Sequence, residues 1–177
     1  MYAINDYVVY GKSGVCKIID IRKEKFGGVE EQTYCVLEPV HSDKSTIYTP
    51  INRNLDKFRR VMSYEEVHDL IQAMPGEETI WIEDLQARGE RYGEILKDGD
   101  PKQLVGLIKT LHFHHEDMLA KGKKMRMSDD KVMHEAEKLL YDEFAYVLEI
   151  KPEEVVPFIK SELESTDKSV FSAEIQK

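Results

Sequence analysis

The sequence predicts an α+β protein in which a small SH3-like or Tudor-like β-barrel precedes an all-α helical domain of about five helices. Residues 1 to about 50 hold short runs of β-branched and aromatic residues separated by glycine turns, which is typical of strands. From Ser63 onward, apolar residues recur at helical spacing. We therefore expect a β-domain over residues 1–60, a helical domain over residues 61–164 and a flexible polar tail over residues 165–177.

Four runs in the N-terminal part have the composition of strands. They are Tyr7–Tyr10, Val15–Ile21, Thr33–Leu37 and Thr46–Thr49. Four or five such short strands cannot cover both faces of a large sheet, so a strongly bent barrel is the economical arrangement. The turn Gly11–Gly14 lacks the glycine and lysine spacing of a phosphate-binding loop and does not lead into a helix.

Caps and helix breakers divide the remainder of the chain into five helices. Ser63 opens the first with a capping box, and Asp100 and Ser128 are the expected N-caps of the third and fourth. The expected bounds are Ser63 to Gly76, about Thr79 to Lys97, Asp100 to about Met118, Ser128 to about Leu148, and a short helix from Pro152. The apolar stripe of the third helix is Leu104, Leu107, Ile108, Leu111 and Met118.

The charge of the chain is unevenly distributed. The formal net charge is −9, but in residues 101–127 six basic side chains stand against two acidic ones. An evenly spread negative charge would repel nucleic acid, whereas a basic stretch between acidic ones can still face phosphates. A solvated helix face explains the same stretch nearly as well, so both interpretations stay open.

Several classes of protein are disfavoured. The only cysteines, Cys16 and Cys35, lie far apart inside strand-like runs, which excludes a CxxC pair or a four-cysteine zinc site. No apolar run approaches the roughly 18 to 20 residues of a membrane span, and the N-terminus lacks the pattern of a secretion signal. No nucleophile and base motif stands out. We expect a cytoplasmic protein that is not an enzyme and has no cofactor.

One histidine-rich segment is the place where a metal or acid-base site would lie. It reads His112-Phe113-His114-His115-Glu116. At about 100° per residue, His115 falls in the apolar stripe while His112 and His114 lie on opposite flanks. Such a spread disfavours one shared ligand set, but a metal-dependent enzyme that uses His112, His115 and Glu116 remains an alternative.

The single tryptophan, Trp81, has two interpretations. If the second helix begins near Thr79, Trp81 shares a face with Leu85, Tyr92 and Ile95, which is typical of a core side chain. The alternative is an exposed tryptophan that contacts a partner.

The order of motifs along the chain resembles a known family. Tyr7–Gly11, Gly14-Val15, Tyr34–Leu37 and Ile47–Pro50 resemble the RNA-polymerase-interacting domain shared by CarD-family regulators and transcription-repair coupling factors. The later part resembles CarD proteins in Trp81-x-x-Asp84-x-x-x-Arg88, Gly99-Asp100, Leu104, Ile108 and Glu137-x-x-Leu140 before Phe144. The resemblance covers about residues 1 to 160.

The resemblance implies a bacterial transcription regulator that acts on the open promoter complex. Its β-domain would bind the RNA polymerase β subunit, through Arg22, Lys23, Thr46, Ile47 and Tyr48. Its helical domain would contact promoter DNA in the minor groove and at phosphates, without sequence specificity, through Trp81, Arg88, Arg91, Lys97, Lys102 and Lys109. The tryptophan would wedge into the minor groove at the upstream edge of the bubble. We expect a monomer with no membrane partner.

One residue of the expected polymerase contact departs from related proteins. Related proteins often carry a basic residue on the strand before the proline, where this chain has Tyr48. A protein-interaction adaptor whose helical half never touches DNA is the main alternative function.

Overall fold

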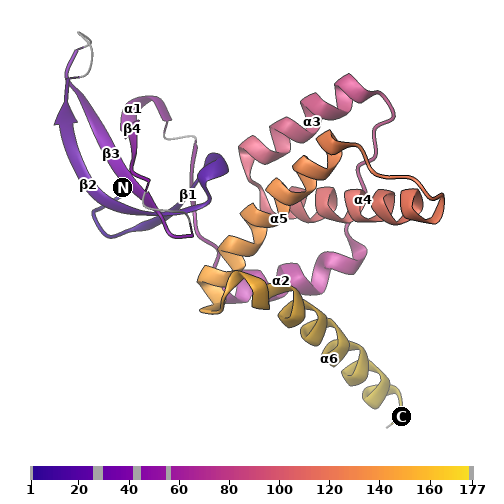
Figure 1. The fold of residues 1–177 in the computed structure, drawn as a ribbon. Coiled ribbons are helices and arrows are strands. Elements are labelled where there is room, and N and C mark those ends of the chain that lie inside the picture. Colours follow the sequence, from indigo (N-terminus) through magenta and orange to yellow (C-terminus); the bar gives the residue numbers. More distant parts are fainter. Residues whose placement is uncertain (1, 26–29, 42–44, 55–56, 176–177) are drawn as a thin grey trace. The chain divides into compact units, whose positions relative to one another are not determined.

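The computed structural model describes residues 2–25, 30–41, 45–54 and 57–175, and it confirms the α+β class (Figure 1). The chain divides into two compact units. One comprises Met1–Val61 with Lys97–Gly99, and the other comprises Met62–Leu96 with Asp100–Lys177. Each unit is built around its own apolar cluster, so the two are described separately.

The first unit is an antiparallel sheet of five strands within the described residues. They are β1 (Tyr7–Tyr10), β2 (Val15–Glu24), β3 (Gln32–Pro39), β4 (Ile47–Pro50) and β5 (Phe58–Arg60), in the spatial order β4-β3-β2-β1-β5. A 3₁₀ turn, Gly11–Ser13, joins β1 to β2, and the short helix α1 (Ile51–Asn54) follows β4. The four runs expected from composition are all strands, whereas β5 has only three residues and no readable alternation.

The β-domain has a small buried core and an irregularly paired strand. Its buried cluster is Val8, Cys16, Ile18, Cys35, Leu37 and Phe58. The pairing of β2 with β3 is irregular between Ile18 and Asp20, and such a bulge bends the strand that carries it. The rings of Tyr2 and Tyr10 pack on Phe58 at centroid distances of 5.3 and 5.1 Å. Both cysteines are buried free thiols, and burial raises the pKa of Cys16 to about 12.

The second unit contains five α-helices in the part of the chain that the structure describes, as the sequence predicts. They are α2 (Tyr64–Ala73), α3 (Leu85–Asp98), α4 (Pro101–Ala120), α5 (Met127–Leu148) and α6 (Val155–Ile175). The 3₁₀ turns Met74–Gly76 and Pro152–Glu154 follow α2 and precede α6. Two predicted caps are confirmed: Ser63 and Glu66 form a reciprocal capping box, and the Asp100 carboxylate accepts from the Gln103 N–H.

The start of α3 differs from the prediction and changes the setting of Trp81. The helix begins at Leu85 and not near Thr79, because the Asp84 carboxylate accepts from the Ala87 N–H at 2.8 Å and caps the first turn. Trp81 therefore lies before the helix, in a segment without regular secondary structure. The prediction that Trp81 shares a helical face with Leu85 and Tyr92 is wrong.

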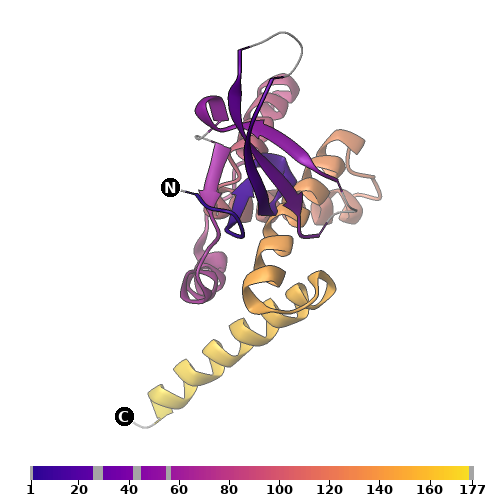
Figure 2. The same ribbon diagram turned by 90° about the vertical axis from the view of Figure 1, so that its left-hand side faces the viewer.

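Two other helix ends are corrected. Arg126, and not Ser128, occupies the N-cap position of α5. The helix from Val155 is 21 residues long and reaches Ile175, so it is not short (Figure 2). The expected tail, residues 165–177, thus begins inside a helix, and its flexibility stays a prediction.

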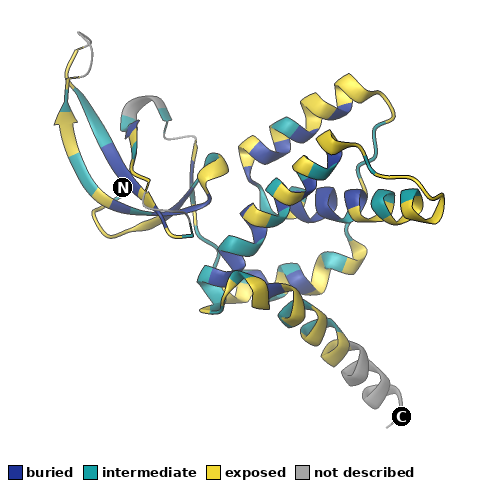
Figure 3. Cartoon of the chain, viewed as in Figure 1, coloured by how far each residue is buried: buried dark blue, intermediate teal, exposed yellow. Residues whose placement is uncertain are grey.

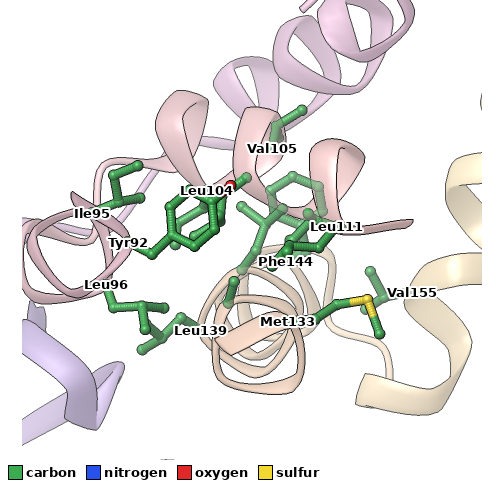
Figure 4. Packing of buried hydrophobic residues seen from close by; sticks show 14 of the residues in the cluster. Tyr92, Ile95, Leu96, Leu104, Val105, Leu111, Met133, Leu139, Phe144 and Val155 are labelled. Carbon is green, nitrogen blue, oxygen red and sulfur yellow. The ribbon is translucent and has the colours of Figure 1, made fainter. Parts of the chain in front are cut away.

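The helices of the second unit enclose one apolar core (Figure 3). Four of the five residues of the predicted α4 stripe are buried, and the fifth, Met118, is half-buried. Figure 4 shows side chains of α3, α4 and α5, among them Tyr92, Leu104 and Leu111, meeting around Phe144. Val155 adds the first turn of α6 to the same cluster. No helix among the described residues is both long and apolar enough to cross a membrane.

Candidate functional site

An exposed cluster on the β-domain sheet joins β2 to β4 across the strand between them. Asp20 lies opposite Val36, and Val36 lies opposite Tyr48, so these side chains share one face. Arg22, two residues along β2, donates from Nη2 to the Tyr48 hydroxyl at 2.9 Å, and its Cζ lies 5.3 Å from the ring centroid. We call Asp20, Arg22, Glu24 and Tyr48 the Arg22–Tyr48 face.

Arg22 is the basic residue of the Arg22–Tyr48 face and lies close to both of its carboxylates. Its Nε lies 3.2 Å from Glu24 Oε1 and 3.7 Å from Asp20 Oδ2. The Arg22 side chain is 42% exposed, so water weakens these ion pairs, and each contributes at most about 1 kcal/mol. The two carboxylates therefore orient the guanidinium over Tyr48 without burying it. The Arg22 guanidinium thus places a positive charge directly beside the Tyr48 ring.

The remaining residues of the predicted polymerase-binding set do not join this face. Ile47 points to the other side of β4 and packs against the β-domain core. Lys23 alternates to the face opposite Arg22 and is exposed, and Thr46 is exposed immediately before β4. Within the described residues β4 is an edge strand that pairs only with β3. Its second edge therefore presents backbone groups of the kind to which a partner strand can pair.

In the helical unit, residues 77–84, which have no regular secondary structure and are here called the Trp81 segment, cross α4 in close contact. A Cβ at Gly106 would lie 2.9 Å from the Glu78 carbonyl oxygen, so only glycine permits this approach without a shift. The Ile80 N–H donates to Thr110 Oγ1 at 2.6 Å, and the Tyr92 hydroxyl donates to the Ile80 carbonyl at 2.7 Å. The backbone on the N-terminal side of Trp81 is therefore fixed by side chains of α3 and α4.

Arg88 fixes the C-terminal side of the same segment. It is 4% exposed, and its Nη1 donates to the carbonyls of Ile82 and Glu83 at 2.7 and 3.2 Å. Its Nε and Nη2 donate to the two carboxylate oxygens of Asp129, in the first turn of α5, at 3.2 and 3.1 Å. Such a bidentate pair fixes both partners in orientation. Arg88 therefore holds the helical unit together, which corrects the prediction that it contacts DNA.

The Trp81 side chain is neither fully buried nor fully exposed. It is half-buried against the helical core and stacks on His114 at a centroid distance of 4.0 Å and an interplanar angle of 24°. Arg88 Cζ lies 4.5 Å from the ring centroid, and the indole N–H donates to exposed Glu83 at 2.9 Å. Beside it is a groove of about 460 Å³, whose wall also includes Phe113 and Lys121.

A basic loop adjoins this groove. Residues 121–126 connect α4 to α5 and carry four basic side chains, which are Lys121, Lys123, Lys124 and Arg126. All four of these side chains are exposed. Lys121 lines the groove and pairs with Asp117 at 2.6 Å. The sequence shows this basic run, but only the structure brings it beside Trp81, since the two are 40 residues apart.

The other predicted DNA contacts lie elsewhere in the chain. Lys109 Nζ donates to the carbonyls of Pro75 and Glu77 at 2.6 and 2.8 Å, so a phosphate would compete with these bonds for its ammonium group. Lys102 is exposed at the start of α4, about 28 Å along the helix axis from Lys121 at a rise of roughly 1.5 Å per residue. Arg91 is exposed and bonds to Glu94 and Gln103, and Lys97 is exposed near the end of α3.

The histidine-rich segment has structural partners. His112 Nε2 lies 2.7 Å from Glu137 Oε1, and this hydrogen bond raises the pKa of His112. His114 stacks on Trp81, and His115 is half-buried. Among the described residues, no group of three or more histidine, cysteine or acidic side chains is placed to hold a metal ion.

The close crossing at Gly106 gives a test of how the Trp81 segment is positioned. Gly106→Ala should displace this segment, because the new Cβ meets backbone, and should cost about 1 to 3 kcal/mol of stability. Gly89→Ala in α3 is the matched control, because nothing lies within 4 Å of its Cβ; it should stabilise by about 0.5 to 1 kcal/mol. Chemical unfolding and the emission of the only tryptophan report both effects. Unchanged stability and emission in Gly106→Ala would contradict the assignment.

Comparison with known protein families identifies the first unit. Residues 2–62 match the family described as the CarD-like/TRCF RID domain. A search of curated proteins found no significant match to the chain. The matched range contains the five described strands and the short helix α1, and it ends before α2. It covers less than half of the chain and does not extend to the helices of the second unit. Residues 2–62 are therefore a CarD-like RNA polymerase-interacting domain.

Proposed function

We propose that this chain is a cytoplasmic transcription regulator that binds the β subunit of bacterial RNA polymerase and stabilises the open promoter complex. The observation that carries the proposal is the RNA polymerase-interacting domain of residues 2–62, which includes the Arg22–Tyr48 face and the edge strand β4. In this proposal the helical unit contacts promoter DNA at the upstream edge of the melted bubble.

The polymerase contact is assigned to the Arg22–Tyr48 face and the adjoining edge of β4. Tyrosine and arginine are among the side chains most enriched at positions that dominate binding energy in protein interfaces. An exposed edge strand adds main-chain hydrogen bonds with a partner strand, and the side chains beside it provide selectivity. Asp20 and Glu24 beside Arg22 make the face mixed in charge, which favours a partner surface that carries both signs.

The DNA contact is assigned to the basic loop together with the groove beside Trp81. Four basic side chains within six residues can each meet a phosphate, and aromatic side chains beside them can meet bases. Trp81, Phe113 and Lys121 line the same groove, so charge and aromatic surface coincide there. Arg91, Lys97 and Lys102 stay predicted phosphate contacts. Arg88 and Lys109 leave the set because their charges are used within the unit.

The net charge of −9 is compatible with this assignment. Sequence-independent DNA binding with a dissociation constant on the order of 10⁻⁴ to 10⁻⁶ M is too weak for a free protein. A domain bound to polymerase raises the effective concentration of DNA at the helical unit to about millimolar, which makes weak contacts sufficient. The polymerase has then already selected the promoter, so the helical unit needs no base-reading element.

One observation favours the alternative of a protein-interaction adaptor. Leu119 and Met127, on either side of the basic loop, are 59% and 89% exposed, and exposed apolar side chains are common in protein interfaces. In that case the loop would bind a protein and not DNA. Salt dependence separates the two functions, because phosphate contacts release counterions.

The polymerase contact is tested with charge reversals on the two faces of β2. In the full chain, Arg22→Glu and Tyr48→Glu should each weaken binding to RNA polymerase about tenfold or more, because they remove the interacting pair. Lys23→Glu, an exposed position on the opposite face of the same strand, should leave binding close to wild type. Affinity is measured on surface-immobilised polymerase. Wild-type binding by folded Arg22→Glu and Tyr48→Glu variants would refute the assigned face.

The DNA contact is tested at the basic loop. Lys123→Glu with Lys124→Glu should shorten the lifetime of promoter complexes and lower the slope of its salt dependence by about one unit for each phosphate interaction removed. Lys131→Glu with Lys138→Glu makes the same charge change on the exposed side of α5 and should have little effect. The effect should be similar on promoters of different sequence. Equal behaviour of the two double variants would favour the adaptor.

A further inference from the structure

A second, mainly apolar cavity lies inside the helical unit, away from the groove beside Trp81. Its volume is about 300 Å³, at the lower end of the range for small-molecule sites. The walls come from the 3₁₀ turn after α2 and from α4, α5 and α6, and they include Val105, Ile108, Leu140, Val156 and Ile159. All these elements belong to one compact unit, so the cavity is formed without a partner.

Two lysines line this cavity, and they differ in whether their ammonium groups are bonded to other groups of the protein. Lys109 lines it, but its ammonium group is bound to the carbonyls of Pro75 and Glu77, which leaves only the aliphatic stem for a ligand. Lys160, in the second turn of α6, lines it and is exposed. Within the described part of the chain, Lys160 makes no side-chain hydrogen bond or ion pair. One uncompensated cation therefore stands beside an apolar cavity.

The remaining lining residues do not oppose a negative charge. No acidic residue is among the described residues that line the cavity. Tyr141 lines it, and burial raises the pKa of its phenol to about 12, so this group stays neutral at physiological pH. Val156 is 38% exposed, which extends the apolar surface outward toward solvent. The chemistry of the site thus fits a ligand with an apolar body and one anionic end.

We propose that this cavity binds a small amphipathic monocarboxylate, with its apolar chain among Val105, Ile108 and Ile159 and its carboxylate paired with Lys160. The apolar chain supplies most of the affinity, because it leaves water for a preformed apolar site. The exposed ion pair adds selectivity for an anion over a neutral analogue. This inference does not depend on the proposed function, because it uses none of the residues assigned to polymerase or DNA.

The experiment titrates the full chain with hexanoate, octanoate, decanoate and dodecanoate below their micelle concentrations, by calorimetry and methyl NMR. Affinity should rise about fourfold per added methylene until the chain exceeds the cavity. The shifted methyl signals should be those of Val105, Ile108, Val156 and Ile159. 1-Decanol is the neutral analogue of decanoate and has the same number of carbon atoms.

Three variants separate the contributions of charge and cavity. Lys160→Gln should weaken decanoate binding about threefold to fivefold and leave 1-decanol binding unchanged. Lys131→Gln removes the same charge outside the cavity and should change neither. Val156→Trp should fill the cavity from its rim and weaken both ligands at least about tenfold, with folding checked by thermal unfolding.

The proposal is overturned by any of three results. One is the absence of saturable binding for every chain length, and another is NMR shifts at methyl groups outside the cavity. The third is an equal effect of Lys160→Gln and Lys131→Gln on decanoate, which would leave an apolar cavity with no selectivity for a carboxylate. The methyl NMR shifts of the wild-type chain show where the ligand binds, so the proposal can be tested even if Val156→Trp fails to fold.

Discussion

The buried ion pair of Arg88 with Asp129 is the interaction on which the helical unit's candidate surface depends. Both side chains are 5% exposed, and one guanidinium joins α3, the carbonyls of residues 82 and 83, and the first turn of α5. Trp81 directly precedes the first of these carbonyls, and the basic loop ends just before α5. Removal of one partner from such a pair typically costs about 3 to 5 kcal/mol, because the other charge stays buried. Its integrity therefore sets the positions of both the tryptophan and the loop.

The two units contribute in different physical ways to the proposed regulator. The β-domain presents the Arg22–Tyr48 face and, within the described residues, an edge strand, β4, that pairs only with β3, which suits a specific protein contact. The helical unit presents long basic side chains and half-buried aromatic rings, which suits a contact that tolerates any sequence. In the proposed regulator, the β-domain thus supplies the affinity for polymerase, and the helical unit supplies the DNA contact. A protein with a net charge of −9 can therefore still act at DNA.

The sequence alone predicts those features of the fold that depend on residues close together in the chain. The strand composition, the Ser63 capping box and the α4 stripe from Leu104 to Leu111 follow from residues a few positions apart, and the structure confirms them. The roles of Arg88 and Lys109 depend on partners 41 and 34 residues away, which no local pattern reveals.

Two local signals in the sequence point to features that periodicity alone does not predict. Asp84 is a strong N-cap residue and marks the start of α3, but a continuous helical pattern through Trp81 conceals it. Gly106 inside an apolar stripe is the second signal, since a buried glycine often marks a close approach of backbone.

The most direct test of the account combines the stability of Trp81→Ala with the lifetime of its promoter complexes. In the proposed wedge role, the ring offsets a few kcal/mol of base unstacking at the bubble edge, while its half-buried position contributes less to folding than a core side chain does. The account predicts a melting temperature close to that of the wild type, unchanged polymerase binding and a shortened lifetime under heparin challenge. A large fall in melting temperature, as expected from the loss of about 3 to 5 kcal/mol for a buried aromatic core residue, would contradict it.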